Sequence, residues 1–165
     1  MKNIKAFFIL FAISLLAGST MANAQEKGPD EIKRIVESQN YVFRAQWANP
    51  QGSISRQLTS EYDLTVSRDT IISYLPYFGR AYVAPINPSE GGIKFTSTKF
   101  DYKQANNGKS WKIMIKPKDA SEVQQLYLDI YDNGKATLQV TSTNRQSISF
   151  SGYVEENKTK GKKAF

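Results

Sequence analysis

The sequence predicts an α+β domain: an N-terminal helix packed on a curled antiparallel meander sheet of seven or eight strands, with a mainly-β open barrel as the alternative. Three observations support this prediction. One short helical pattern opens the folded region, and alternating apolar and polar residues follow it almost to the C-terminus. The connections between these runs are too short for parallel crossovers. The 165 residues suit a single domain, expected over residues 25–157.

The segment before residue 25 has the pattern of a secretory signal peptide. Lys2 and Lys5 precede the apolar run Ala6–Ala17, and Ala22-Asn23-Ala24 is a small-residue cleavage site. The apolar run is shorter than the ~20 residues of a membrane-spanning helix, so cleavage near Ala24 is expected, with a retained anchor as the alternative. No Cys follows the run, which excludes a lipoprotein. We expect a periplasmic or secreted protein with no transmembrane segment in the mature chain.

The chain is basic, with 22 Lys and Arg against 15 Asp and Glu. Lys2 and Lys5 leave with the signal peptide, and most of the remaining excess lies in the segment Lys158–Phe165. The body of the domain is therefore nearly neutral, and its composition predicts no nucleic-acid partner. We expect residues 158–165 to be a flexible basic tail.

A helix is expected to begin at Gly28-Pro29-Asp30-Glu31, because Pro suits the first turn and carboxylates favour the positive end of the helix dipole. Ile32, Ile35, Val36 and Gln39 then follow at helical spacing, and Asn40 is a plausible end. A helix this short is not stable alone. We expect it to plug one end of a half-barrel or to lie across the concave face of the sheet.

Alternation predicts eight strands. They run over Tyr41–Trp47, Arg56–Ser67, Thr70–Leu75, Ile93–Lys103, Ser110–Lys116, Leu126–Tyr131, Ala136–Val140 and Ile148–Val154. In the first strand, Trp47 shares its phase with Phe43 and Ala45. In the fourth, the apolar phase slips, which predicts a bulge or a sharp bend near Ser97–Lys99. Asn133-Gly134 predicts a tight hairpin, because both residue types tolerate positive φ.

Three stretches of the chain carry a family resemblance. They read YLPYFGRA at Tyr74–Ala81, GGIKF at Gly91–Phe95 and SFSGY at Ser149–Tyr153. With these stretches, the region Gln39–Glu155 resembles the secreted bacterial domain-of-unknown-function family 4251 (DUF4251). The resemblance implies a single secreted domain and brings no catalytic residues with it.

The residue types present exclude several chemistries. The chain has no Cys and no His, so disulfides, thiol nucleophiles, imidazole catalysis and the usual zinc sites are absent. Asp129–Gly134 resembles a calcium loop but lacks its full ligand set, and no phosphate or dinucleotide motif occurs. We expect no metal, no cofactor and no enzymatic activity. A carboxylate-based hydrolase such as a glycosidase is the alternative, although no acidic pair is marked by its spacing.

The first candidate binding site lies in the long connection Pro76–Gly92. It contains Tyr77, Phe78, Arg80 and Tyr82, and aromatic and Arg residues are favoured at binding hot spots. The alternative is structural: Phe78 and a Tyr would cap an open end of the barrel, and Arg80 would pair with a carboxylate.

The second candidate is the solvent face of the C-terminal hairpin. Tyr127, Asp129 and Tyr131 share one side of a strand, and hairpin pairing is expected to bring Thr137 and Gln139 alongside. Aromatic rings beside hydroxyl, amide and carboxylate groups could stack on a sugar and bond its hydroxyls. Alternatively, these are ordinary residues of a half-exposed strand.

Together these observations predict a non-catalytic binding or envelope-accessory protein. The ligand is expected to be a glycan, a lipid or another protein of the envelope. A structural envelope protein that needs only its surface is a second alternative, after the hydrolase.

Overall fold

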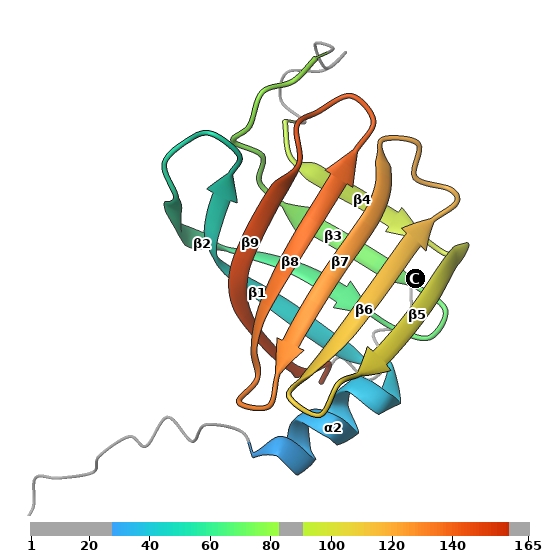
Figure 1. Cartoon of the computed structure of the whole chain (residues 1–165). Helices are drawn as coiled ribbons and strands as arrows, with labels where there is room; N and C mark the ends of the chain where they lie inside the picture. Colours follow the sequence, from blue (N-terminus) through green and yellow to red (C-terminus); the bar gives the residue numbers. More distant parts are fainter. Residues whose placement is uncertain (1–27, 83–90, 159–165) are drawn as a thin grey trace, which may run out of the picture.

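The computed structural model describes residues 28–82 and 91–158 (Figure 1). These residues form one helix and nine strands. Their bounds are α2 Pro29–Ser38, β1 Tyr41–Pro50, β2 Arg56–Val66, β3 Ile71–Leu75, β4 Ile93–Ser97, β5 Phe100–Asn106, β6 Ser110–Pro117, β7 Val123–Tyr131, β8 Lys135–Ser142 and β9 Ile148–Glu156. The predicted signal peptide and all but the first residue of the predicted basic tail lie outside the described residues.

All nine strands belong to one antiparallel sheet with the order β4-β3-β2-β1-β9-β8-β7-β6-β5. The sheet curls into a nearly closed barrel, with β5 to β9 on the near side in Figure 1 and β1 to β4 behind them. The α+β prediction is therefore wrong in emphasis, and its mainly-β barrel alternative fits better. One ten-residue helix contributes little beside nine strands, because curling lets the sheet cover its own apolar face.

The expected strand over Ile93–Lys103 is divided in two, which raises the count from eight to nine. Its first part, β4, pairs with β3, and its second part, β5, pairs with β6. Each pair of neighbouring strands is antiparallel, including β1 with β9, so β4 and β5 must run in the same sense around the barrel. They behave as one bent strand that changes partner at Thr98 and Lys99. The predicted bend near Ser97–Lys99 is confirmed.

A bulge in β1 changes which side chains face the core. The register with both neighbouring strands shifts between Ala45 and Trp47. Ala45 and Ala48 are buried, whereas Trp47 is 44% exposed, so the expected common phase of Trp47 and Ala45 is wrong. Gly152 lies opposite this irregularity, where a β-carbon would stand only 1.9 Å from the carbonyl oxygen of Arg44. Only glycine allows β1 and β9 to approach so closely.

The helix closes one end of the barrel, as the first of its two predicted placements had it (Figure 1). Ile32, Ile35 and Val36 are buried in the core, which confirms the predicted apolar stripe. Ile32 reaches the β7–β8 hairpin, because its Cδ1 lies 3.0 Å from the position of a β-carbon at Gly134. The predicted hairpin is present and Gly134 has φ 81°, but Asn133 does not adopt the positive φ that was expected of both residues.

Side chains from both walls fill the interior. Tyr41, Phe43 and Phe150 are among the largest fully buried ones. The hydroxyl oxygens of Tyr41 on β1 and Tyr102 on β5 lie 3.2 Å apart, so a hydrogen bond links strands far apart in the sheet. Within residues 28–82 and 91–158, no helix has the length and apolar character needed to cross a membrane.

Candidate functional site

The four residues of the first candidate site do not gather into one surface. Tyr77 is partly buried, Phe78 is 37% exposed beneath the guanidinium of Arg56, and Tyr82 is 66% exposed. Arg80 is exposed and makes no ion pair with another described residue. The centre of the connection, residues 83–90, lies outside the described part of the chain.

Tyr77 links the start of this connection to the β8–β9 turn by hydrogen bonding. Its hydroxyl lies 2.8 Å from the carbonyl oxygen of Arg80 and 3.0 Å from that of Gln146, and donates its proton between them. Backbone bonds reinforce the attachment, from Tyr82 N–H to the Asn144 carbonyl and from Gln146 N–H to the Arg80 carbonyl. Burial raises the pKa of the Tyr77 phenol, although the charge of Arg145 opposes the change.

The residues expected around Tyr127 and Asp129 at the second candidate site do lie together. The predicted pairing is present, since Tyr127 lies opposite Gln139 and Asp129 lies opposite Thr137. Both rows continue across the sheet, because Gln139 pairs with Ser149 and Thr137 with Ser151. Directly paired residues point to the same face of a sheet, so the rows run side by side over the outside of β7, β8 and β9.

A groove of about 580 Å³ follows these rows, and we call it the β7–β9 groove. It is lined by Asn49, Gln51, Tyr127, Asp129, Thr137, Gln139, Ser147, Ile148 and Ser149. Almost all of these side chains carry an amide, a hydroxyl or a carboxylate. Tyr127 is 43% exposed and supplies an aromatic face. Tyr131 is 49% exposed but does not line the groove, because it lies farther along β7 toward the hairpin turn.

Asp129 is the one lining residue with a buried side-chain oxygen that lacks a hydrogen-bond partner among the described residues. Its Oδ1 atom is buried and has no hydrogen-bond partner. Lys112 lies opposite on β6, yet the two side chains form no ion pair within the described residues. A buried acceptor without a donor costs about 1–3 kcal/mol, so a donor brought by a ligand would be favourable here.

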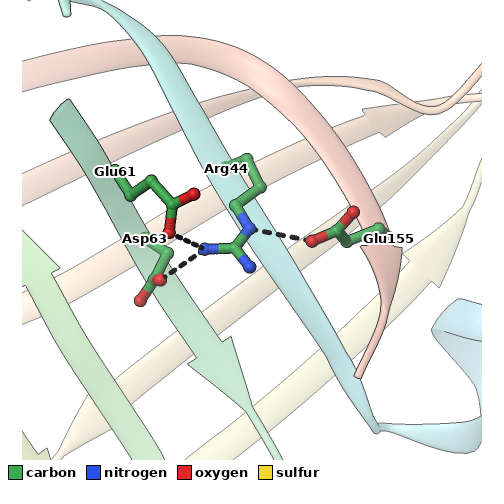
Figure 2. A network of polar contacts seen from close by, with 4 residues as sticks. All are labelled: Arg44, Glu61, Asp63 and Glu155. Carbon is green, nitrogen blue, oxygen red and sulfur yellow. Dashed lines mark hydrogen bonds and ion pairs between the residues drawn. The ribbon is translucent and has the colours of Figure 1, made fainter. Parts of the chain in front are cut away.

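A second polar cluster lies on the other half of the barrel and is centred on Arg44 (Figure 2). Arg44 on β1 holds Asp63 on β2 at 2.8 Å and Glu155 on β9 at 2.8 Å, and Glu61 stands 3.9 Å away. The three carboxylates point toward the guanidinium from both sides, as Figure 2 shows. Three adjacent strands are thereby joined on their outer face, beside a groove of about 390 Å³.

The charges of this cluster do not affect its members equally. The pKa of Arg44 is raised, first by its hydrogen bond to Glu155. The pKa of Asp63 is also raised, because partial burial and the neighbouring carboxylates outweigh the attraction of Arg44. Residues 28–82 and 91–158 contain no group of acidic side chains arranged to hold a metal ion.

Comparison with known families agrees with this architecture. The family model described as a domain of unknown function (DUF4251) matches residues 23–154. The chain belongs to this family. A crystal structure of a DUF4251 family protein from Bacteroides eggerthii DSM 20697 is similar, with a TM-score of 0.53 and 14% sequence identity. That likeness covers 78% of this chain and 87% of the other, and it concerns the fold alone. No curated protein matches the chain.

Sequence reasoning missed the part of the β7–β9 groove that comes from the N-terminal half of the chain. Asn49 and Gln51 follow the expected strand Tyr41–Trp47, and their residue types alone indicate no more than a turn. Trp47 lies on the same outer row as Ser151 because of the β1 bulge. The sequence also contained no signal for Arg145, which is almost fully buried in the β8–β9 turn. The placements of Asn49 and Trp47 depend on the pairing of β1 with β9, which no local pattern reveals.

Proposed function

We propose that this DUF4251 chain is an exported, non-catalytic binding protein, and that the β7–β9 groove holds a glycan. The single observation behind the proposal is the groove itself. One exposed aromatic ring and a series of amide, hydroxyl and carboxylate groups lie together over three adjacent strands.

The chemistry of the lining suits a sugar. Hydroxyl and amide groups both donate and accept hydrogen bonds, as sugar hydroxyls do, so Thr137, Gln139 and Asn49 can adapt to either partner. The ring of Tyr127 offers an apolar face to the C–H side of a pyranose. Asp129 accepts hydrogen bonds only, and its unpartnered oxygen favours a ligand that donates. Ile148 is the one aliphatic side chain among the described residues that line the groove, so the lipid alternative has less support than the glycan.

Binding to a panel of bacterial envelope polysaccharides and host glycans tests the proposal, with titration calorimetry on each positive. Removing the ring in Tyr127→Ala should weaken binding about tenfold, as the loss of one aromatic contact of about 1.5 kcal/mol implies. Asp129→Asn should weaken it too, because the amide is a poorer acceptor. Tyr74→Ala is the matched control, since Tyr74 is 47% exposed on β3 outside the groove.

Two outcomes would contradict the glycan proposal. In one, no member of the panel binds to the intact protein. In the other, a glycan binds but Tyr127→Ala and Asp129→Asn leave its affinity unchanged.

Export is supported by the N-terminal pattern and has its own test. Expression of the full chain in a bacterium, followed by fractionation and N-terminal sequencing, should yield a periplasmic or secreted protein that begins at Gln25. A cytoplasmic protein that retains Met1 would contradict the export proposal and leave the groove unaffected.

A carboxylate-based hydrolase remains the alternative, and the Arg44 cluster is the observation that favours it. Asp63 does not itself line the 390 Å³ groove, but Arg44, Glu61 and Glu155 of its cluster do. The raised pKa of Asp63 is typical of a general acid. Against this, Arg44 binds both Asp63 and Glu155 and turns them toward itself rather than toward each other. Release of reducing ends from the same panel, abolished by Asp63→Asn, would replace the binding proposal with the hydrolase.

A further inference from the structure

The bent strand leaves a gap in the wall of the barrel. One edge of β4 pairs with β3, and the other edge faces the β6–β7 loop. The bend itself is closed, because Asp119 accepts hydrogen bonds from the Ser97 hydroxyl and from the backbone N–H groups of Thr98 and Lys99. Away from the bend, a pocket of about 260 Å³ lies between β4 and the β6–β7 loop. We call it the seam pocket.

Arg145 forms the inner wall of the seam pocket. Its side chain is only 9% exposed, which is unusual for an arginine. Nη1 donates to the carbonyl oxygens of Gly91 and Gly92 at 3.2 and 3.0 Å, and Nη2 lies 3.1 Å from Oε2 of Glu122. The guanidinium stands 5.3 Å from the centre of the Tyr77 ring. It is thereby held rigidly at the edge of an open space.

The hydrogen-bonding capacity of Arg145 is not exhausted. A guanidinium carries more N–H groups than these three bonds use, and those left at Nε and Nη2 have no partner among the described residues. Its only carboxylate partner among the described residues is Glu122, whose side chain is 58% exposed and can swing into solvent. An incoming carboxylate can therefore take the place of Glu122 without breaking the bonds to Gly91 and Gly92.

The remaining lining is mixed. Ile93 and Val123 are buried and Phe95 is partly buried, so they form an apolar patch beside the arginine. Ser121 and Ser142 add hydroxyl groups. Asp119 is already engaged at the bend, which leaves Glu122 as the acidic group facing Arg145. The pocket volume is below the ~300–1,000 Å³ of drug-sized sites, so its occupant must be small.

We propose that the seam pocket binds a small organic acid, whose carboxylate replaces Glu122 on Arg145 and whose short apolar body lies on Ile93, Phe95 and Val123. This site shares no residue with the β7–β9 groove. The proposal does not rest on the glycan proposal, and either can fail without the other.

The test is calorimetric titration of the intact protein with straight-chain carboxylates from acetate to decanoate, and with the alcohols of the same lengths. Saturable binding is expected for carboxylates of intermediate length and not for the alcohols. Glu122→Gln removes the internal competitor and should tighten binding by about threefold or more, since an exposed ion pair contributes up to about 1 kcal/mol. Glu61→Gln, at another exposed glutamate, should change nothing.

Two further variants locate the site. Arg145→Met should lose at least about tenfold in affinity, as expected for a hydrogen bond to a charged group. Because this variant removes structural bonds as well, Ser142→Leu provides a second measurement: it fills the pocket, keeps Arg145 and should abolish binding. The proposal is overturned if no carboxylate of any length binds saturably. It is equally overturned if Glu122→Gln leaves the affinity unchanged or weakens it.

Discussion

The helix end of the barrel is closed by Ile32, Ile35 and Val36, all inserted into the core, whereas the loop end is joined by Arg145, Tyr77 and Glu122. The apolar side chains at the helix end pack together in the core. The loop end depends on directional hydrogen bonds between separate loops, and the seam pocket remains beside them. One end is thus closed by apolar packing, and the other is closed by polar bonds and has the seam pocket beside it.

The largest loss of stability is expected from a substitution at the helix end of the barrel. Ile32→Ala should lower the free energy of unfolding by about 2–5 kcal/mol, because the side chain is fully buried and its removal leaves a cavity. Chemical denaturation measures the loss. Ile54→Ala is the control, since Ile54 is 84% exposed and should change stability by less than about 0.5 kcal/mol. Equal effects would mean that α2 does not seal the barrel.

A smaller loss in the free energy of unfolding is expected from a substitution at the loop end. Arg145→Met keeps much of the buried volume but leaves the carbonyls of Gly91 and Gly92 without their donor, at a cost of about 1–3 kcal/mol. Arg80→Met is the matched control, because Arg80 makes no ion pair among the described residues. A loss as large as that of Ile32→Ala would show that both ends are equally structural. No loss at all would remove Arg145 as the closing group.

Removal of one hydroxyl should have a milder effect. Tyr77→Phe keeps the ring under Arg145 and deletes the bond shared by the Arg80 and Gln146 carbonyls, so we expect a loss of about 1 kcal/mol. Tyr82→Phe, at a 66% exposed position, should be neutral. If both variants are neutral in denaturation, the loop end is held by backbone bonds alone.

The smallest effect concerns pH. Hydrogen bonds, first from the Ser97 hydroxyl and then from Thr98 N–H, lower the pKa of Asp119 from 3.8 to about 2. A lowered pKa stabilises the folded state above pH 4, and this contribution is lost as the pH falls from about 4 to 2. Asp119 is exposed, so the effect should be small.

Melting temperatures across this acid range measure the Asp119 effect. The temperature should fall less steeply for Asp119→Asn than for the unaltered protein, while Asp132→Asn should show no difference. Parallel curves for Asp119→Asn and the unaltered protein would mean that the bend does not depend on the carboxylate charge.

The candidate sites were predictable only where they lie within one hairpin. Tyr127, Asp129, Thr137 and Gln139 could be placed together, because the Asn133-Gly134 turn determines their register. Asn49 and Trp47 could not be added, since they reach this surface through the pairing of β1 with β9 and through a bulge. The residues of the seam pocket come from three segments far apart in the chain.

The sequence by itself determined the elements that depend on neighbours along the chain: the helix with its buried stripe, the strands with their alternating faces, the bend near Ser97–Lys99 and the Asn-Gly hairpin. Helical spacing and strand alternation are local, so they can be read without knowing partners. Only the tertiary structure decided which strand edges meet, that β4 and β5 have different partners, and that Arg145 lies beside the resulting gap. These outcomes depend on hydrogen bonds between distant residues and on closure of the whole sheet, for which no local pattern exists.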